Sequence, residues 1–155
     1  MNRTTYLNIA GKEYPMRFSM GTNIRITERY GSMKGFQEIL LGDGGEGKAL
    51  KEITWILKTM IDQGCAYKNL FEKDMPAPES APVKDGKYVS LTEEELEIGL
   101  DLSGAGMMEI KMKIFECFGT GNKHEVEEKK DEDKKNEMTT QEQKLLRGYL
   151  FGKGF

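Results

Sequence analysis

The sequence predicts an α+β protein that is mainly helical, with an N-terminal β-hairpin packed on a small helical bundle and a disordered, charged C-terminal tail. Two observations predict the folded part. Apolar and polar residues alternate with the period of a strand near the N-terminus, and apolar residues recur at helical spacing further along. A third observation predicts the tail, because residues 119–138 hold almost no apolar side chains and cannot offset the entropy of ordering them.

A chain of 155 residues is long enough for one ordinary core and an appendage. We expect one compact domain at 1–119, which includes an exposed connector at 72–87 that holds three of the four prolines. A charged, disordered tail at 120–138 follows the domain. The last part, 139–155, recovers apolar residues and is expected to form a short tethered amphipathic helix.

Composition argues against several classes of function. Charged residues make up 32% of the chain and the formal net charge is −3, so no basic excess indicates binding to nucleic acid. No N-terminal apolar run is of signal-peptide type, and no apolar window is long enough to span a membrane. We therefore expect a cytoplasmic protein without nucleic-acid or membrane partners, in which Cys65 and Cys117 are reduced structural thiols.

Two alternating stretches predict the N-terminal hairpin. In Tyr6 to Ala10 and again in Tyr14 to Phe18, apolar side chains alternate with other residues, and Ala10 to Glu13 supplies a tight turn. Pro15 has no N–H to donate, which favours an edge position for the second strand. A hairpin alone is marginal in water, so this one needs a core to pack on.

Two short helices are expected next. The stretch from Gly21 to Tyr30 starts with capping-type residues and is followed by Gly31, and Ser32 to Leu41 repeats the pattern with Ser32 as the cap. Each helix is too short to be stable without tertiary contacts.

The strongest helix signal lies in Lys48 to Gly64. At 100° per residue its apolar side chains fall within an arc of roughly 140°, the wide stripe of a helix packed on a core. Gly64 is expected to end this helix as a left-handed cap, and Cys65 to Phe71 either extend it by a turn or lie along the core. Trp55 falls on the opposite face of the helix, outside the apolar stripe that packs on the core.

Two more helices complete the predicted bundle. Thr92 and Glu95 can form a capping box for a helix that runs to about Leu100. After Ser103, a candidate cap, Ala105 to Phe118 is apolar over most of its circumference. Such a helix is either buried in its own core or partly covered by another chain, and the sequence leaves both interpretations open.

The second interpretation defines a candidate partner-binding surface. Methionine-rich surfaces adapt to varied helical partners because the side chain is flexible and polarisable. Together with the leftover tryptophan, the surface comprises Trp55, Met107, Met108, Lys111, Met112, Phe115 and Phe118.

The sequence argues against an enzyme. Nucleophilic catalysis needs a positioned base, and the single histidine, His124, falls in the charged tail without a second metal ligand at matching spacing. The glycine-rich run Gly42 to Gly47 precedes a helix as a phosphate loop does, but Lys48 is followed by Ala49 rather than by Ser or Thr. We predict no catalytic residues, no metal and no cofactor, and a binding module instead.

Three stretches carry a resemblance to a known family. The stretches are LNIAGKEYPMRFSMGTNIRITERYGS at Leu7 to Ser32, ITWILKTMIDQGCAYKN at Ile53 to Asn69 and LTEEELEIGL at Leu91 to Leu100. The order of these stretches along the chain resembles that in the tail assembly chaperones of long-tailed, siphovirus-like bacteriophages of Gram-positive hosts. The resemblance covers Tyr6 to Phe118.

The resemblance implies a small, mainly helical α+β protein that acts during virion morphogenesis in the host cytoplasm and is not part of the mature virion. Proteins of this family bind the tape-measure protein, keep its apolar helices soluble and help to recruit subunits of the major tail tube protein. They often occur in two lengths through a ribosomal frameshift. The apolar stretch Thr139 to Phe155 departs from what we can place in the family.

Other functions stay open at this stage. The chain could self-associate as a homo-oligomer, a ring or spiral around its client. It could instead be a structural tail or head-to-tail connector subunit that is retained in the virion. A regulatory protein that acts on DNA is a third alternative, which the absence of a basic face weakens.

Overall fold

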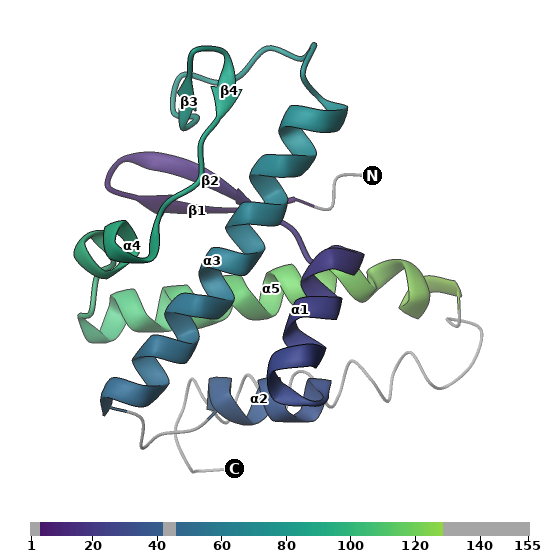
Figure 1. Cartoon of the computed structure of the whole chain (residues 1–155), viewed down its shortest axis with the longest axis vertical. Coiled ribbons are helices and arrows are strands. Elements are labelled where there is room, and N and C mark those ends of the chain that lie inside the picture. Colours follow the sequence, from purple (N-terminus) through teal and green to yellow (C-terminus); the bar gives the residue numbers. More distant parts are fainter. Residues whose placement is uncertain (1–3, 42–45, 129–155) are drawn as a thin grey trace.

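A computed structural model describes residues 4–41 and 46–128, with side chains for 4–41 and 49–119. It confirms the α+β fold, mainly helical, with an N-terminal hairpin against a bundle of helices (Figure 1). The elements are β1 (Thr5–Ile9), β2 (Lys12–Met16), α1 (Met20–Tyr30), α2 (Met33–Leu41), α3 (Glu46–Phe71), β3 (Val83–Lys84), β4 (Lys87–Tyr88), α4 (Glu93–Gly99) and α5 (Gly104–Glu128).

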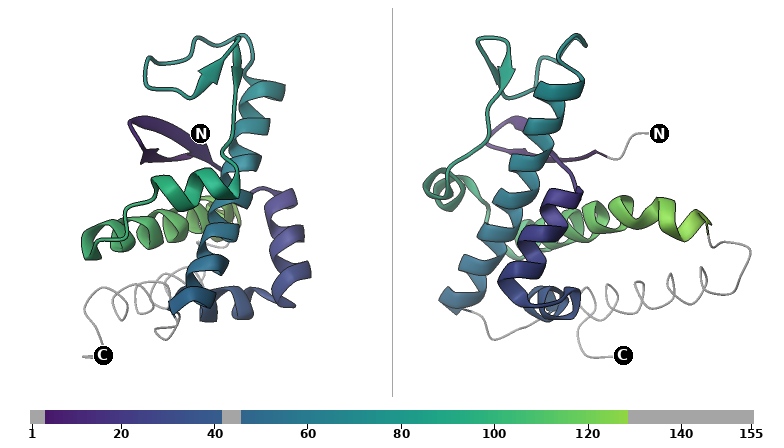
Figure 2. Two further views of the ribbon diagram at one scale, coloured as in Figure 1. Left: turned by 60° about the vertical axis from the view of Figure 1, so that its left-hand side comes forward. Right: turned by 45° about the vertical axis from the view of Figure 1, so that its right-hand side comes forward.

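Helix α3 is the central element of the fold. Figure 1 shows it running the length of the molecule, with α1 and α2 on one side, α4 on the other, and α5 crossing behind it. The views in Figure 2 show the β1–β2 hairpin against α3. The core lies between these elements, and its fully buried side chains include Met16, Ile26, Phe36, Leu40, Ile56, Leu57, Met60, Ile61, Leu96 and Ile114.

The N-terminal hairpin is confirmed, with a tighter turn than the sequence suggested. β1 and β2 pair antiparallel from Thr5 opposite Met16 to Ile9 opposite Lys12, so only Ala10 and Gly11 form the turn. Both residues have positive φ, 53° and 88°, as a type I′ turn requires. Each strand is an edge of this two-stranded sheet, which leaves room for Pro15 in β2.

Gly64 does not end the main helix as a cap. Of the two alternatives for Cys65 to Phe71, the helical extension is confirmed, because α3 continues to Phe71. A Cβ on Gly64 would lie 2.2 Å from the carbonyl oxygen of Pro15, so the residue serves the packing of β2 on the helix rather than a cap. The backbone N–H of Arg17 donates to the carbonyl of Met60 at 3.1 Å. The hairpin therefore sits with its backbone directly on α3 at this point.

Helices α1 and α2 begin and end close to the predicted residues. Ser19 caps α1 by accepting a hydrogen bond from the N–H of Thr22, and Gly31 ends it in the left-handed conformation. The Ser32 hydroxyl accepts from the N–H of Gly35 at the start of α2, at 3.2 Å. These caps satisfy backbone groups that a helix terminus leaves without partners.

The connector at 72–87 is not entirely irregular, and this corrects the prediction. Val83 to Tyr88 forms a small antiparallel hairpin, β3–β4, around Asp85 and Gly86, both with positive φ. Asp-Gly is the usual pair for such a turn, so the signal was present in the sequence. The Asn69 side chain holds β4 against α3 by donating to the carbonyl of Tyr88 and accepting from its N–H, at 3.0 and 2.8 Å.

The predicted starts of the last two helices, α4 and α5, are confirmed, whereas the predicted end of α5 is corrected. The capping box of Thr92 and Glu95 is present at α4, and the Ser103 hydroxyl accepts from the N–H of Gly106 at the start of α5. Helix α5 passes through Gly119 and ends at Glu128, so its predicted end at Phe118 is wrong. The rest of the predicted tail and the apolar stretch at 139–155 lie outside the described residues.

Two further findings concern the described part of the chain only. None of its helices is long and apolar enough to cross a membrane. It also holds no group of three or more histidine, cysteine, aspartate or glutamate side chains arranged to bind a metal ion.

Candidate partner-binding surface

The predicted surface residues on α5 differ in exposure, and some of them are buried. Phe118 is 7% exposed and packs edge-on against Phe18, with ring centroids 5.1 Å apart. Lys111 is also 7% exposed, and burial lowers the pKa of its ammonium group. These two residues belong to the interior of this chain, so their placement on an accessible surface was wrong.

Three of the predicted residues form an accessible row along α5. Met108 and Met112 are 38% and 42% exposed, and Phe115 is half-buried at the edge of the core. Spacings of four and three residues put these side chains on one side of the helix. We call Met108, Met112 and Phe115 the methionine stripe.

Met107 lies elsewhere, in an apolar groove of about 260 Å³ between α3, α4 and the start of α5. Its apolar lining is contributed by Leu50, Ile53, Leu96, Leu100, Leu102, Met107 and Ile110. On the α5 wheel Met107 and Ile110 point away from the methionine stripe, because successive residues turn by 100°. The structure therefore separates one predicted surface into two, on opposite flanks of the helix.

The rim of the apolar groove is polar. Lys51 and Thr54 of α3 lie on one side and Glu97 of α4 on the other. Pockets that take drug-sized ligands usually measure about 300–1,000 Å³, and this groove is smaller. Its size and lining suit one or two apolar side chains from a larger partner better than a free small molecule.

Trp55 is not left over, because α1 covers the face on which it lies. Its ring packs edge-on against Tyr30, with centroids 5.9 Å apart, and the Arg29 guanidinium lies 4.4 Å from its centre. Arg29 is held in turn by Glu52 at 2.8 Å, which also accepts from the Tyr30 hydroxyl at 2.6 Å. Burial and this hydrogen bond raise the pKa of Tyr30.

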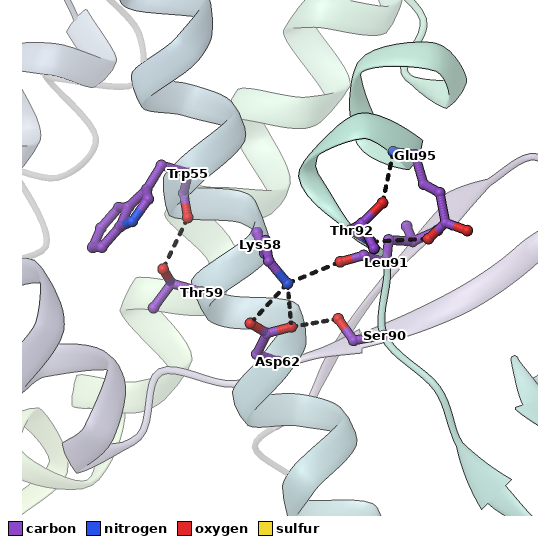
Figure 3. Close-up of polar contacts among 8 residues, drawn as sticks. All are labelled: Trp55, Lys58, Thr59, Asp62, Ser90, Leu91, Thr92 and Glu95. Carbon is purple, nitrogen blue, oxygen red and sulfur yellow. Dashed lines mark hydrogen bonds and ion pairs between the residues drawn. The ribbon is translucent and has the colours of Figure 1, made fainter.

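The exposed edge of Trp55 borders a second, polar pocket of about 300 Å³. Figure 3 shows the side chains beside it: Lys58 donates to both carboxylate oxygens of Asp62 and to the carbonyl of Leu91, and the Ser90 hydroxyl donates to Asp62. These contacts attach the segment before α4 to α3. They account for the polar groups of Lys58, Asp62 and Ser90 as contacts within the fold.

The remaining reactive groups are the two thiols. Cys65 is 4% exposed and Cys117 is fully buried, and neither forms a disulfide. Burial raises the pKa of both, which keeps them protonated and unreactive at neutral pH. The side chain of His124 lies outside the described side chains, and the prediction that the protein is not an enzyme stays a prediction.

Sequence reasoning missed the apolar groove. Leu96 and Leu100, four residues apart, and Leu50 and Ile53, three apart, each have the spacing of an ordinary core-facing stripe. Nothing in either stripe indicates that the two helices diverge enough to leave a gap between them.

No protein-family model, curated protein or solved structure matches this chain.

Proposed function

We propose that this protein binds apolar α-helices of a client protein and keeps them in solution, as a tail assembly chaperone during the morphogenesis of a long-tailed bacteriophage. The observation that carries the binding part of the proposal is the apolar groove between α3, α4 and α5. The phage assignment rests on the resemblance of the sequence alone.

The groove supports a helix as its ligand. A helix that lies along a groove inserts side chains spaced three or four residues apart, and the apolar lining would remove these from water. Burying one leucine-sized side chain contributes about 1.5–3 kcal/mol. Lys51 and Glu97 on opposite rims offer one charge of each sign to polar residues that flank such anchors, while the flexible Met107 side chain accommodates different shapes.

The client in this proposal is the tape-measure protein, whose long apolar helices need cover before a tail tube surrounds them. Bound chaperone would also help to recruit the major tail tube protein and would leave before the virion is complete. The alternative is a structural tail or connector subunit. It would use the same groove for a permanent contact inside the particle.

A matched pair of variants tests the groove. Leu102 lines it and is 61% exposed, whereas Ile98 is 78% exposed on α4 but does not line it. Both can be changed to aspartate without burying a charge. We expect Leu102→Asp to weaken capture of the client by at least about tenfold, the equivalent of 1.4 kcal/mol, and Ile98→Asp to leave capture unchanged. Equal capture by both variants would remove the groove from the proposal.

A pull-down from infected cells tests the biological assignment. Tagged protein should co-purify with a very long helical protein, and the chain should be missing from purified particles when both samples are analysed by mass spectrometry. Recovery of the chain in the particles would instead support the structural subunit.

A further inference from the structure

The apolar groove and the polar pocket beside Trp55 are neighbours along the same two helices. Helix α3 lines the groove with Thr54 and the polar pocket with Trp55, the next residue. Helix α4 lines the groove with Glu97 and the polar pocket with Glu93, one turn apart and on the same side of that helix. The two pockets therefore follow each other between α3 and α4, and we call them together the extended groove.

The extended groove is acidic along one side and basic along the other. Helix α4 contributes an exposed carboxylate to each pocket, Glu97 and Glu93, while Lys51 of α3 lines the apolar groove and Arg25 of α1 lines the polar pocket. Helices α1 and α4 lie on opposite sides of α3 (Figure 1). None of the four charged side chains forms an ion pair within the described part of the chain. Each pocket thus offers one uncompensated charge of each sign to an occupant.

The lining changes in polarity along the extended groove. It begins with apolar side chains near Leu50, continues with the half-buried ring of Trp55, and ends at Lys58 and Asp62. Those last two residues form an ion pair at 3.1 Å, so together they add no net charge. Figure 3 shows them on α3 with the start of α4 beside them. From Leu50 to Asp62 the helix rises by roughly 18 Å, which is the length of about three turns of an occupying helix.

Charge complementarity identifies the occupant. A helix in a groove presents an apolar stripe to the floor and one flank to each side. Glu93 and Glu97 are about 6 Å apart along α4, which matches two basic residues one turn apart on a helix that lies alongside. Acidic residues on the other flank would meet Lys51 and Arg25, and like charges on either side would be repelled. Turning a helix end for end exchanges its flanks, so the order of charges also sets the direction in which the helix binds.

We propose that the extended groove binds an amphipathic helix of at least about three turns from the client protein, with basic residues along α4 and acidic residues along Lys51 and Arg25. Its apolar side chains fill the apolar groove, and the next turn packs on the ring of Trp55. The inference rests on the proposed function, because it extends the client helix from the apolar groove into the polar pocket. It adds the length, the charge pattern and the direction of that helix.

Two synthetic peptides test the charge pattern by fluorescence anisotropy with the full chain. Both have about 18 residues, leucines at helical spacing on one face, and the same numbers of lysines and glutamates. The first peptide has its lysines along one flank and its glutamates along the other, whereas the second has both kinds mixed on both flanks; circular dichroism checks that the two are equally helical. We expect the first peptide to bind at least about tenfold more tightly. Equal binding of the two, or no binding of the first, overturns the proposal.

A matched pair of variants tests contact with the polar pocket. Glu93→Lys changes the α4 side of that pocket. Glu94→Lys changes the next residue, which is also exposed in the first turn of α4 but lines neither pocket. We expect Glu93→Lys to weaken binding of the first peptide by at least about fivefold, and Glu94→Lys by less than about twofold. Equal effects of the two variants would show that the helix does not reach the polar pocket, and the proposal would fail.

Leu102→Asp, in the apolar groove, separates this inference from the proposed function. If Leu102→Asp weakens binding of both peptides while the peptides bind equally well to the unchanged chain, the groove still binds apolar helices and the charge pattern alone is refuted. If Leu102→Asp leaves binding of both peptides unchanged, the proposed function fails together with this inference.

Discussion

Replacing Gly64 by alanine is the most direct test of how the hairpin sits on the central helix. A Cβ at this position would lie 2.2 and 2.4 Å from the carbonyl oxygen and carbon of Pro15, and 2.8 Å from the nitrogen of Met16. All three are backbone atoms, so no side chain can rotate to make room. Either β2 must move off α3 or the helix must bend.

The size of the effect follows from three opposing contributions. Alanine favours a helix interior over glycine by about 1 kcal/mol. Overpacking costs about 1–3 kcal/mol or more, and displacing β2 also breaks the hydrogen bond from Arg17 to Met60, worth about 1 kcal/mol. We expect Gly64→Ala to lower the free energy of unfolding by about 2–3 kcal/mol, at the upper end of those ranges.

Urea unfolding followed by far-UV circular dichroism measures this change, with Gly119→Ala as the matched control. Gly119 is also inside a long helix, and a Cβ there would meet nothing within 4 Å. Gly119→Ala should therefore raise the free energy of unfolding by about 1 kcal/mol. If Gly64→Ala were stabilising to the same extent, the close approach of β2 to α3 would be refuted.

Three further predictions concern local contacts. Ala10→Gly should raise the free energy of unfolding by about 0.5–1 kcal/mol in the same urea assay, because Ala10 adopts a positive φ of 53° that disfavours a side chain; a loss of stability would contradict a type I′ turn. Asn69→Ala should speed hydrogen exchange at the Tyr88 amide by about tenfold or more, since it removes both hydrogen bonds that hold β4, and an unchanged rate would show that β4 is held otherwise. Burial raises the pKa of the Cys65 thiol from 9.0 to about 12 and also raises that of Cys117. The unfolded chain therefore loses these protons first, and the free energy of unfolding should fall as pH rises above 9.0, by up to about 1.4 kcal/mol per pH unit and thiol. Urea titrations at several pH values should show a shallower fall for the Cys65→Ala, Cys117→Ala double variant, and equal slopes would argue against thiol burial.

Local signals allowed much of the fold to be predicted from the sequence. The capping box at Thr92 and Glu95 and the caps at Ser32 and Ser103 involve groups at most three residues apart, so they form wherever the chain becomes helical. The alternation in Tyr6 to Ala10 likewise expresses a strand with one face buried. The fold class and the starts of most helices depend on such short-range chemistry, and both could be predicted.

Only the tertiary structure decided which faces remained accessible. Gly64 has the residue type of a cap, but a strand nearly 50 residues earlier in the chain makes it a packing site inside a continuous helix. The sequence predicted that Trp55 lies outside the core, whereas in the structure Tyr30 and Arg29 of α1 pack against its ring. The apolar circumference of α5 was divided by its neighbours into a core face, a wall of the apolar groove and the methionine stripe. Apolar attraction has no direction, so an apolar pattern specifies that a side chain is to be buried, while the positions of distant elements determine what buries it.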